Sequence, residues 1–208
     1  MKRQRWTRRK DARAPEILEA ALACFSEKGF AATRMEEIAE RAAVSKGTIY
    51  LYFKSKEAVF EALVRRAVGV RIADATDQVD AFEGPTPDLL RMVLRKVGPV
   101  ISAGDQPLPR IVLAEAGNFP ELAEYWRREV VDRGLGLWEA IIRRGLARGE
   151  FRDVDPSHVA RLCVAPFIVA SLWRSVLERS DPVPCDYQGL IDSHIDILLR
   201  GLAAEDKT

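Results

Sequence analysis

Apolar residues recur at helical spacing along most of the chain, and this periodicity limits the possible folds more than any other feature. Residues 17, 21, 24 and 25 are apolar at i, i+4, i+7 and i+8, and residues 191, 195 and 198 continue the pattern near the other end. No segment alternates apolar and polar residues between turn pairs of the Asn-Gly type, as hairpin strands do. We therefore expect an all-α fold of about nine helices.

Capping residues and breaks indicate where these helices begin and end. Pro15 suits the first turn of the first helix, and Gly29 suits its C-terminal cap. Thr33 and Glu36 have the spacing of a capping box. Side-chain caps are expected at four later helix starts, namely Ser45, Ser55, Asp155 and Asp186. Breaks are expected at 82–87, 104–109 and 181–184, with a short helix near 110–116 and a long one from about 120 to 148.

The second and third expected helices are separated by a very short turn. Only Ala43 and Val44 lie between the end of one pattern and the Ser45 cap of the next. Such a turn forces a steep crossing, as in a DNA-binding helix-turn-helix. Gly47 costs about 1 kcal/mol inside a helix relative to alanine, which makes sense if the backbone there must approach another molecule closely. The alternative is that Gly47 permits tight helix packing and that the nearby tyrosines are half-buried core residues.

The net charge of +1 conceals an asymmetry along the chain. Residues 1–66 carry fifteen Lys or Arg and nine Asp or Glu, whereas the remainder has a net charge of −5. Seven of the first thirteen residues are basic, and only Asp11 among them is acidic. A basic N-terminal segment followed by an acidic remainder favours a polyanionic partner, and nucleic acid is the first candidate. A solubilising tail is the alternative.

The segment from Ile17 to about Leu63 resembles the TetR/AcrR family of bacterial transcription regulators. The stretches that carry the resemblance are Ile17–Ala21, Phe25–Phe30, Thr33, Ile38–Ala39, Ala43–Tyr50, Tyr52–Glu57 and Leu63. The resemblance implies a basic arm and helix-turn-helix DNA-binding domain at 1–56. It also implies a helical ligand-binding and dimerisation domain at 57–208, connected by a helix from about 55 to 72.

The resemblance also implies which residues contact double-stranded operator DNA. Thr33 and Tyr50 have hydroxyls for phosphates, Lys56 is placed for the backbone, and Lys46, Gly47 and Thr48 are candidates for base edges. The full expected set is Thr33, Arg34, Ser45, Lys46, Gly47, Thr48, Tyr50, Tyr52 and Lys56. The basic arm, residues 2–13, is expected in a minor groove, on phosphates, or as a tail that adds salt-dependent affinity.

In such a family the middle helices hold an inducer pocket, and the last two helices form a homodimer. Large side chains that suit a small apolar or aromatic ligand are Met92, Phe119, Trp126, Trp138 and Phe167; plain core packing is the alternative for each. Helices at about 155–178 and 186–203 are expected to pair with their copies through residues such as Val159, Cys163 and Ile195. The alternative is that both pack only within one subunit.

The function implied is a sequence-specific transcriptional regulator, a repressor released from its operator by a ligand. A protein of this fold without an inducer, in an architectural role, is one alternative; a helical enzyme or carrier is another. No Gly-rich phosphate loop, Gly-x-Ser-x-Gly, His-Glu-x-x-His or Cys-x-x-Cys motif occurs, so we expect no enzyme. We expect no metal at His158 or His194 and no cofactor.

The expected location is cytoplasmic. Three widely spaced cysteines suit reduced thiols, and the first residues lack the apolar segment of a secretory signal. The uncharged stretch from Leu162 to Trp173 has twelve residues, fewer than the twenty or so of a membrane-spanning helix, so we expect no membrane segment.

Overall fold

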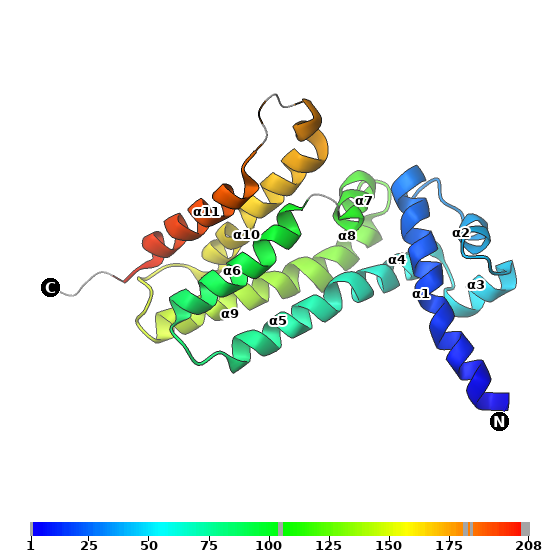
Figure 1. The fold of residues 1–208 in the computed structure, drawn as a ribbon, viewed down its shortest axis with the longest axis horizontal. Coiled ribbons are helices and arrows are strands. Elements are labelled where there is room, and N and C mark those ends of the chain that lie inside the picture. Colours follow the sequence, from blue (N-terminus) through cyan, green and yellow to red (C-terminus); the bar gives the residue numbers. More distant parts are fainter. Residues whose placement is uncertain (1, 104–105, 181–182, 184, 205–208) are drawn as a thin grey trace. The chain divides into compact units, whose positions relative to one another are not determined.

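The computed structural model describes residues 2–103, 106–180, 183 and 185–204, and of residues 2–12, 70 and 179 it describes the backbone alone. The described residues form helices connected by short turns (Figure 1). The α-helices are α1 (Lys2–Lys28), α2 (Met35–Arg41), α3 (Lys46–Tyr52), α4 (Lys56–Val64), α5 (Val70–Ala81), α6 (Thr86–Ser102), α7 (Pro107–Glu115), α8 (Pro120–Trp126), α9 (Arg133–Ala147), α10 (Pro156–Leu172) and α11 (Tyr187–Leu202).

Short segments of wider or tighter helix join some of these elements end to end. They are the π-helical η1 (Arg65–Gly69), η2 (Arg127–Asp132) and η3 (Trp173–Leu177), and the 3₁₀-helical η4 (Glu178–Ser180). Residues 56–81, 120–147 and 156–180 therefore each form one continuous helical run, giving nine helical segments in the described chain. A single bridge, Phe151 to Ala203, is the β pairing found there. The expected all-α fold is confirmed.

The chain forms two compact units, each with its own core. Unit 1 comprises the described residues up to 70 together with 107–130, and unit 2 comprises 71–106 and the described residues from 131 onward. Helices α7 and α8 therefore belong with the helix-turn-helix, because the Phe119 ring packs 5.0 Å from that of Phe30 and the Glu115 carboxylate accepts the Ala31 N–H at 3.0 Å. The compact units are discontinuous in sequence, whereas the division at residue 56 separates a DNA-binding from a ligand-binding domain by function and stays a prediction.

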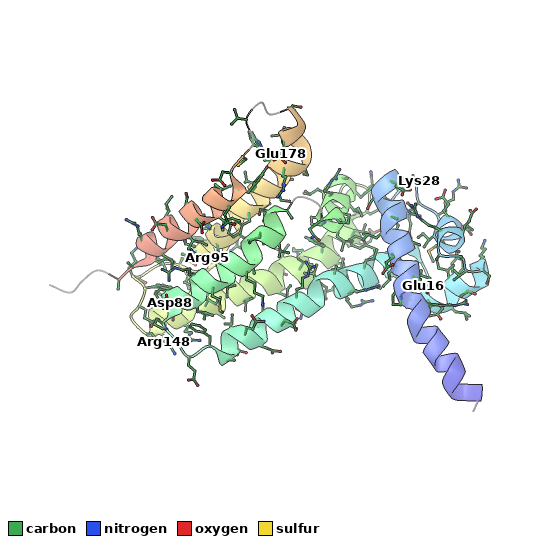
Figure 2. All side chains as sticks on the ribbon, in the orientation of Figure 1. Glu16, Lys28, Asp88, Arg95, Arg148 and Glu178 are labelled. Atoms are coloured by element: carbon green, nitrogen blue, oxygen red, sulfur yellow. The ribbon has the colours of Figure 1, made fainter. Side chains whose placement is uncertain are left out.

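Unit 2 is a bundle in which α6, α9, α10 and α11 pack against one another (Figure 1). Its fully buried residues include Leu89, Leu94, Ile141, Cys163 and Phe167. Arg95 on α6, labelled in Figure 2, pairs with Asp192 on α11 at 3.5 Å. The Arg144 guanidinium of α9 donates to the carbonyls of Val79 and Gly84 at 3.3 and 3.2 Å, which fixes the chain as it leaves α5.

Most expected helix caps are confirmed, but the expected starts of α1, α2 and α7 are wrong, and α7 begins at Pro107 within the expected break at 104–109. The Ser45, Ser55, Asp155 and Asp186 side chains each accept a backbone N–H at the start of their helix, and Gly29 has φ +84°. Helix α1, however, begins at Lys2, not near Pro15. A proline inside a helix removes one N–H donor, and α1 continues past it. Of the expected breaks, residues 104–105, 181–182 and 184 lie outside the described residues.

The expected capping box between Thr33 and Glu36 is not formed. The N-cap of α2 is Arg34, whose backbone N–H donates to the Glu37 carboxylate at 3.1 Å. The Thr33 hydroxyl instead donates to the Gly29 carbonyl at 2.7 Å. The N-cap of α2 is therefore one residue later than expected. The Thr33 hydroxyl is not available as a cap because it bonds to the Gly29 carbonyl that the end of α1 leaves free.

One described helical run, Pro156–Leu177, is long and apolar enough to cross a membrane by length and composition alone. The expectation of no membrane segment rested on an uncharged stretch of twelve residues within this longer run. A core helix of a bundle can pass the same test.

Candidate DNA-binding surface

The turn between α2 and α3 closes by backbone hydrogen bonds around Ala43. The Val44 N–H donates to the Ala39 carbonyl at 2.9 Å, and the Ala43 N–H donates to the Glu40 carbonyl at 3.0 Å. These are the two bonds of a Schellman motif, which places its central residue in the left-handed region. Ala43 accordingly has φ +52°. This motif lets α3 start at Lys46, only five residues after α2 ends at Arg41, as a helix-turn-helix requires.

Three ion pairs fasten the first three helices together. Arg41 of α2 donates to both carboxylate oxygens of Glu27 on α1, at 2.6 and 2.5 Å. Lys28, at the end of α1 (Figure 2), pairs with Glu37 at 2.7 Å. A third pair joins Lys46 of α3 to Glu36 of α2 at 2.6 Å. The hydrogen bond from its partner lowers the pKa of each of the three carboxyls, so the fold favours their charged forms.

Helix α3 is anchored by one face and exposed on the other. Ile49 is fully buried in the core of unit 1, and Tyr52 is half-buried against it. Ser45, Lys46 and Gly47 are exposed, Thr48 is half-buried, and Tyr50 is 41% exposed. A Cβ atom built on Gly47 would meet only the Ser45 hydroxyl, at 3.9 Å, so tight packing does not explain this glycine.

Two residues expected at phosphates have polar groups bonded inside unit 1. Thr33 is 2% exposed and donates to the Gly29 carbonyl. The Lys56 ammonium donates to the carbonyls of Phe30 and Ala31 at 2.8 and 3.0 Å, and it lies 4.6 Å from the centre of the Phe30 ring. A phosphate would have to compete with these bonds. Arg34, by contrast, is exposed.

Comparison with known proteins identifies the family of this helix-turn-helix. Residues 17–63 match the model of bacterial regulatory proteins of the tetR family, and residues 83–181 match that of the tetracyclin repressor-like C-terminal domain. The HTH-type transcriptional regulator YfiR of Bacillus subtilis is 31% identical over 206 residues, covering 95% of this chain and 96% of the relative. The chain belongs to the TetR family. It is therefore a transcriptional regulator that binds DNA.

Two further relatives of this TetR-family protein have names that bear on regulation. The HTH-type transcriptional repressor KstR2 of Mycobacterium tuberculosis is 26% identical over 200 residues, covering 94% of this chain and 95% of the relative. The solved SmeT–triclosan complex is 25% identical with a TM-score of 0.74, covering 94% of this chain and 93% of that one.

The structure divides the residues expected at a ligand between the two units. Trp138 and Phe167 lie in the core of unit 2, at 3% and 0% exposure, while Met92 on α6 is 37% exposed. Phe119 and Trp126 pack against the core of unit 1. The set is therefore not one cluster within either unit.

Leu51 is a residue of the TetR-family recognition helix that the sequence reasoning missed. Its side chain is 71% exposed, the highest value among the large apolar side chains of the described residues. It lies two residues after the buried Ile49, a spacing that places the two on opposite sides of a helix. That spacing from a residue on the core face is the signal by which the sequence could identify Leu51 as exposed.

Proposed function

We propose that this TetR-family protein is a repressor that binds its operator as a homodimer and leaves it when a small apolar or aromatic ligand binds. The observation that carries the DNA part is the exposed face of α3, where Ser45, Lys46 and Tyr50 are exposed together with Gly47, a glycine with open space around it. A recognition helix presents such a face to the base edges of the major groove. The role is regulatory rather than catalytic, and its place is the cytoplasm, where the DNA is.

An exposed apolar face supports dimerisation through α10 and α11. Leu162, Val169, Leu172 and Val176 repeat at helical spacing along α10 and η3, and they are 57%, 60%, 41% and 65% exposed. On α11, Ile197 is 70% exposed. A row of exposed apolar side chains along one helix is typical of a protein–protein interface. A second copy of the same face would bury it in an isologous dimer.

The interface residues differ from most of those expected. Val159, Cys163 and Phe167 of α10 are 6% exposed or less, as are Ile191 and Ile195 of α11. They pack within one subunit because α10 is apolar on two faces, one of which covers the core of unit 2. Burial raises the pKa of the Cys163 thiol to about 12. Leu162, next to Cys163 in the sequence, lies on the outer face instead.

The ligand part of the proposal is supported by the relatives. KstR2 is named a ketosteroid regulator, and SmeT is solved with triclosan. We place ligand contacts in unit 2 at Met92, Trp138 and Phe167, whose side chains suit apolar or aromatic compounds. Phe119 and Trp126 belong to unit 1 and stay predictions.

A gel shift with the DNA upstream of the protein's own gene tests the DNA part. The double variant Lys46→Ala/Tyr50→Ala is expected to lose the shifted band while its helical circular dichroism stays as in the wild type, because both side chains are exposed. Leu113→Ala, a change at a 66% exposed leucine of α7, is the matched control and should shift DNA normally. A normal shift by the double variant would show that the site assignment is wrong.

Operator affinity with and without ligand tests release. Triclosan and a ketosteroid are titrated onto the protein and followed by tryptophan fluorescence, and operator binding is then measured with each compound bound. At least one bound compound should weaken operator binding, and the operator must weaken binding of that compound by the same factor. Unchanged operator affinity in the presence of every bound compound would contradict the proposal.

A further inference from the structure

The outermost ridge of the recognition helix is apolar. Gly47 and Leu51 are four residues apart on α3 and therefore lie one above the other on the same face. The space around Gly47 is open, with the Ser45 hydroxyl at 3.9 Å as the nearest atom to an added Cβ, and Leu51 is 71% exposed. The buried Ile49 lies on the opposite face.

Polar side chains at the start of α3 already have partners within the chain. The Lys46 ammonium lies 2.6 Å from the Glu36 carboxylate, and this hydrogen bond raises the pKa of Lys46. The hydroxyls of Ser45 and Thr48 are 2.8 Å apart, and Ser45 also accepts the Thr48 N–H at 3.1 Å. Base contacts from these groups would be shared with their present partners, whereas an apolar contact from Leu51 shares no hydrogen-bonding group.

The major groove offers one apolar group on its base edges, the C5 methyl of thymine. An exposed leucine on a helix that enters this groove is complementary to that methyl group, and the glycine one turn away lets the helix backbone come close. We propose that Leu51 is a specificity-determining residue of this regulator that contacts a thymine methyl in each operator half-site. The proposal rests on α3 being the helix that enters the major groove.

Deoxyuridine, which lacks only the C5 methyl group, provides the test. The full-length wild-type protein first selects a high-affinity duplex from a random library. Each thymine of that duplex is then replaced in turn by deoxyuridine, symmetrically in both half-sites, and binding is measured by fluorescence anisotropy at one fixed salt concentration. We expect one position at which the replacement weakens wild-type binding by about four-fold per half-site, the ratio for one buried methyl group.

Leu51→Ala should bind the thymine duplex more weakly than the wild type and should bind the thymine and deoxyuridine duplexes equally. Its thermal unfolding should match the wild type because the side chain is exposed. Leu113→Ala, a change at a 66% exposed leucine on α7, should keep the wild-type ratio.

Two results would overturn the proposal: no thymine at which the wild type senses the methyl group, or the same ratio in Leu51→Ala as in the wild type. If the wild type selects no duplex at all, the assignment of α3 to the major groove fails together with it. Selective wild-type binding without a methyl effect refutes the role of Leu51 alone.

Discussion

Ala43 carries backbone strain at the centre of the helix-turn-helix. Its φ of +52° is in the left-handed region, which costs a residue with a Cβ about 1 kcal/mol and costs glycine nothing. Ala43→Gly should therefore raise the free energy of unfolding by up to about 1 kcal/mol, less the extra chain entropy of glycine. Chemical denaturation of both proteins measures this difference.

The reverse substitution, from glycine to alanine at a positive φ, can be made at Gly149. It has φ +67° and open space around it, so an alanine fits there but is strained. Gly149→Ala should lower the free energy of unfolding by about 1 kcal/mol. If both substitutions change stability in the same direction, backbone strain is not the cause.

Three carboxylates make the stability of the helix-turn-helix depend on pH. Hydrogen bonds from Arg41, Lys46 and Lys28 lower the pKa values of Glu27, Glu36 and Glu37 in the folded state. Between those lowered values and the ordinary glutamate pKa, the unfolded chain binds more protons, so stability is present above this window and is lost as pH falls through it. The midpoint temperature of thermal unfolding should therefore decrease as the pH is lowered from 5 to 3.

Replacement of all three glutamates by glutamine is the control for that pH dependence. The variant cannot lose these charges, so its midpoint should fall less steeply over the same range. High salt should also reduce the difference because the pairs are exposed. If the thermal midpoint depends on pH equally steeply in both proteins, the acid sensitivity comes from groups other than these three glutamates.

For single residues, the sequence predicted the helix caps well but not the side-chain contacts with residues far away in the chain. Ser45 and Asp155 were identified because a cap bonds to its own helix, two or three residues away. The partners of Lys56 within the chain were not predicted, because Phe30, Ala31 and Phe119 are 25 to 63 positions away in the sequence. Gly47 was recognised as unusual, whereas only its surroundings in space excluded packing as the reason.

Tyr125 connects two helices at the point where one of them changes from α to π geometry. Its hydroxyl accepts a hydrogen bond from Arg65, the first residue of η1, at 2.9 Å and donates to the Glu61 carbonyl at 3.4 Å. A side chain that takes a helix carbonyl is a known cause of such irregularities. The 3.6-residue period predicted a regular helix here, because a π segment depends on a residue from another helix.

Tyr125→Phe removes both hydrogen bonds and keeps the ring. It should lower the free energy of unfolding by about 1 kcal/mol and speed hydrogen exchange of the amides at 65–69. Tyr50→Phe removes a hydroxyl from a 41% exposed ring and should leave both quantities unchanged. Normal exchange in Tyr125→Phe would mean that the hydroxyl does not hold η1.

Two exposed apolar surfaces, one at Leu51 on α3 and one along α10, distinguish this protein from a helical bundle whose apolar side chains all face its own core. The sequence predicted that the last two helices are apolar, but it could not separate the stripe that covers the core from the stripe that remains exposed, because α10 carries both. Cys163 and Val169 differ by six positions in an apolar run, yet they are 0% and 60% exposed. Only the packing of α10 against α6 and α9 distinguishes them.

The exposed stripe allows dimerisation to be separated from folding. Val169→Glu and Val176→Glu place charges on side chains that are already exposed, so each chain should fold with wild-type helicity. In a dimer the same charges would be buried without partners, which is costly. Light scattering should show the mass falling from two chains to one. Operator affinity should fall by about 10² or more, because the two half-sites are no longer bound by one molecule.

Leu113→Glu places the same charge at a 66% exposed site on α7 and should leave both the mass and the operator affinity unchanged. A dimeric Val169→Glu/Val176→Glu protein would show that the copies meet elsewhere. A monomer that still binds DNA as tightly as the wild type would show that dimerisation is not what provides the affinity. Loss of mass and affinity together, with helicity kept, ties the exposed stripe of α10 to operator binding.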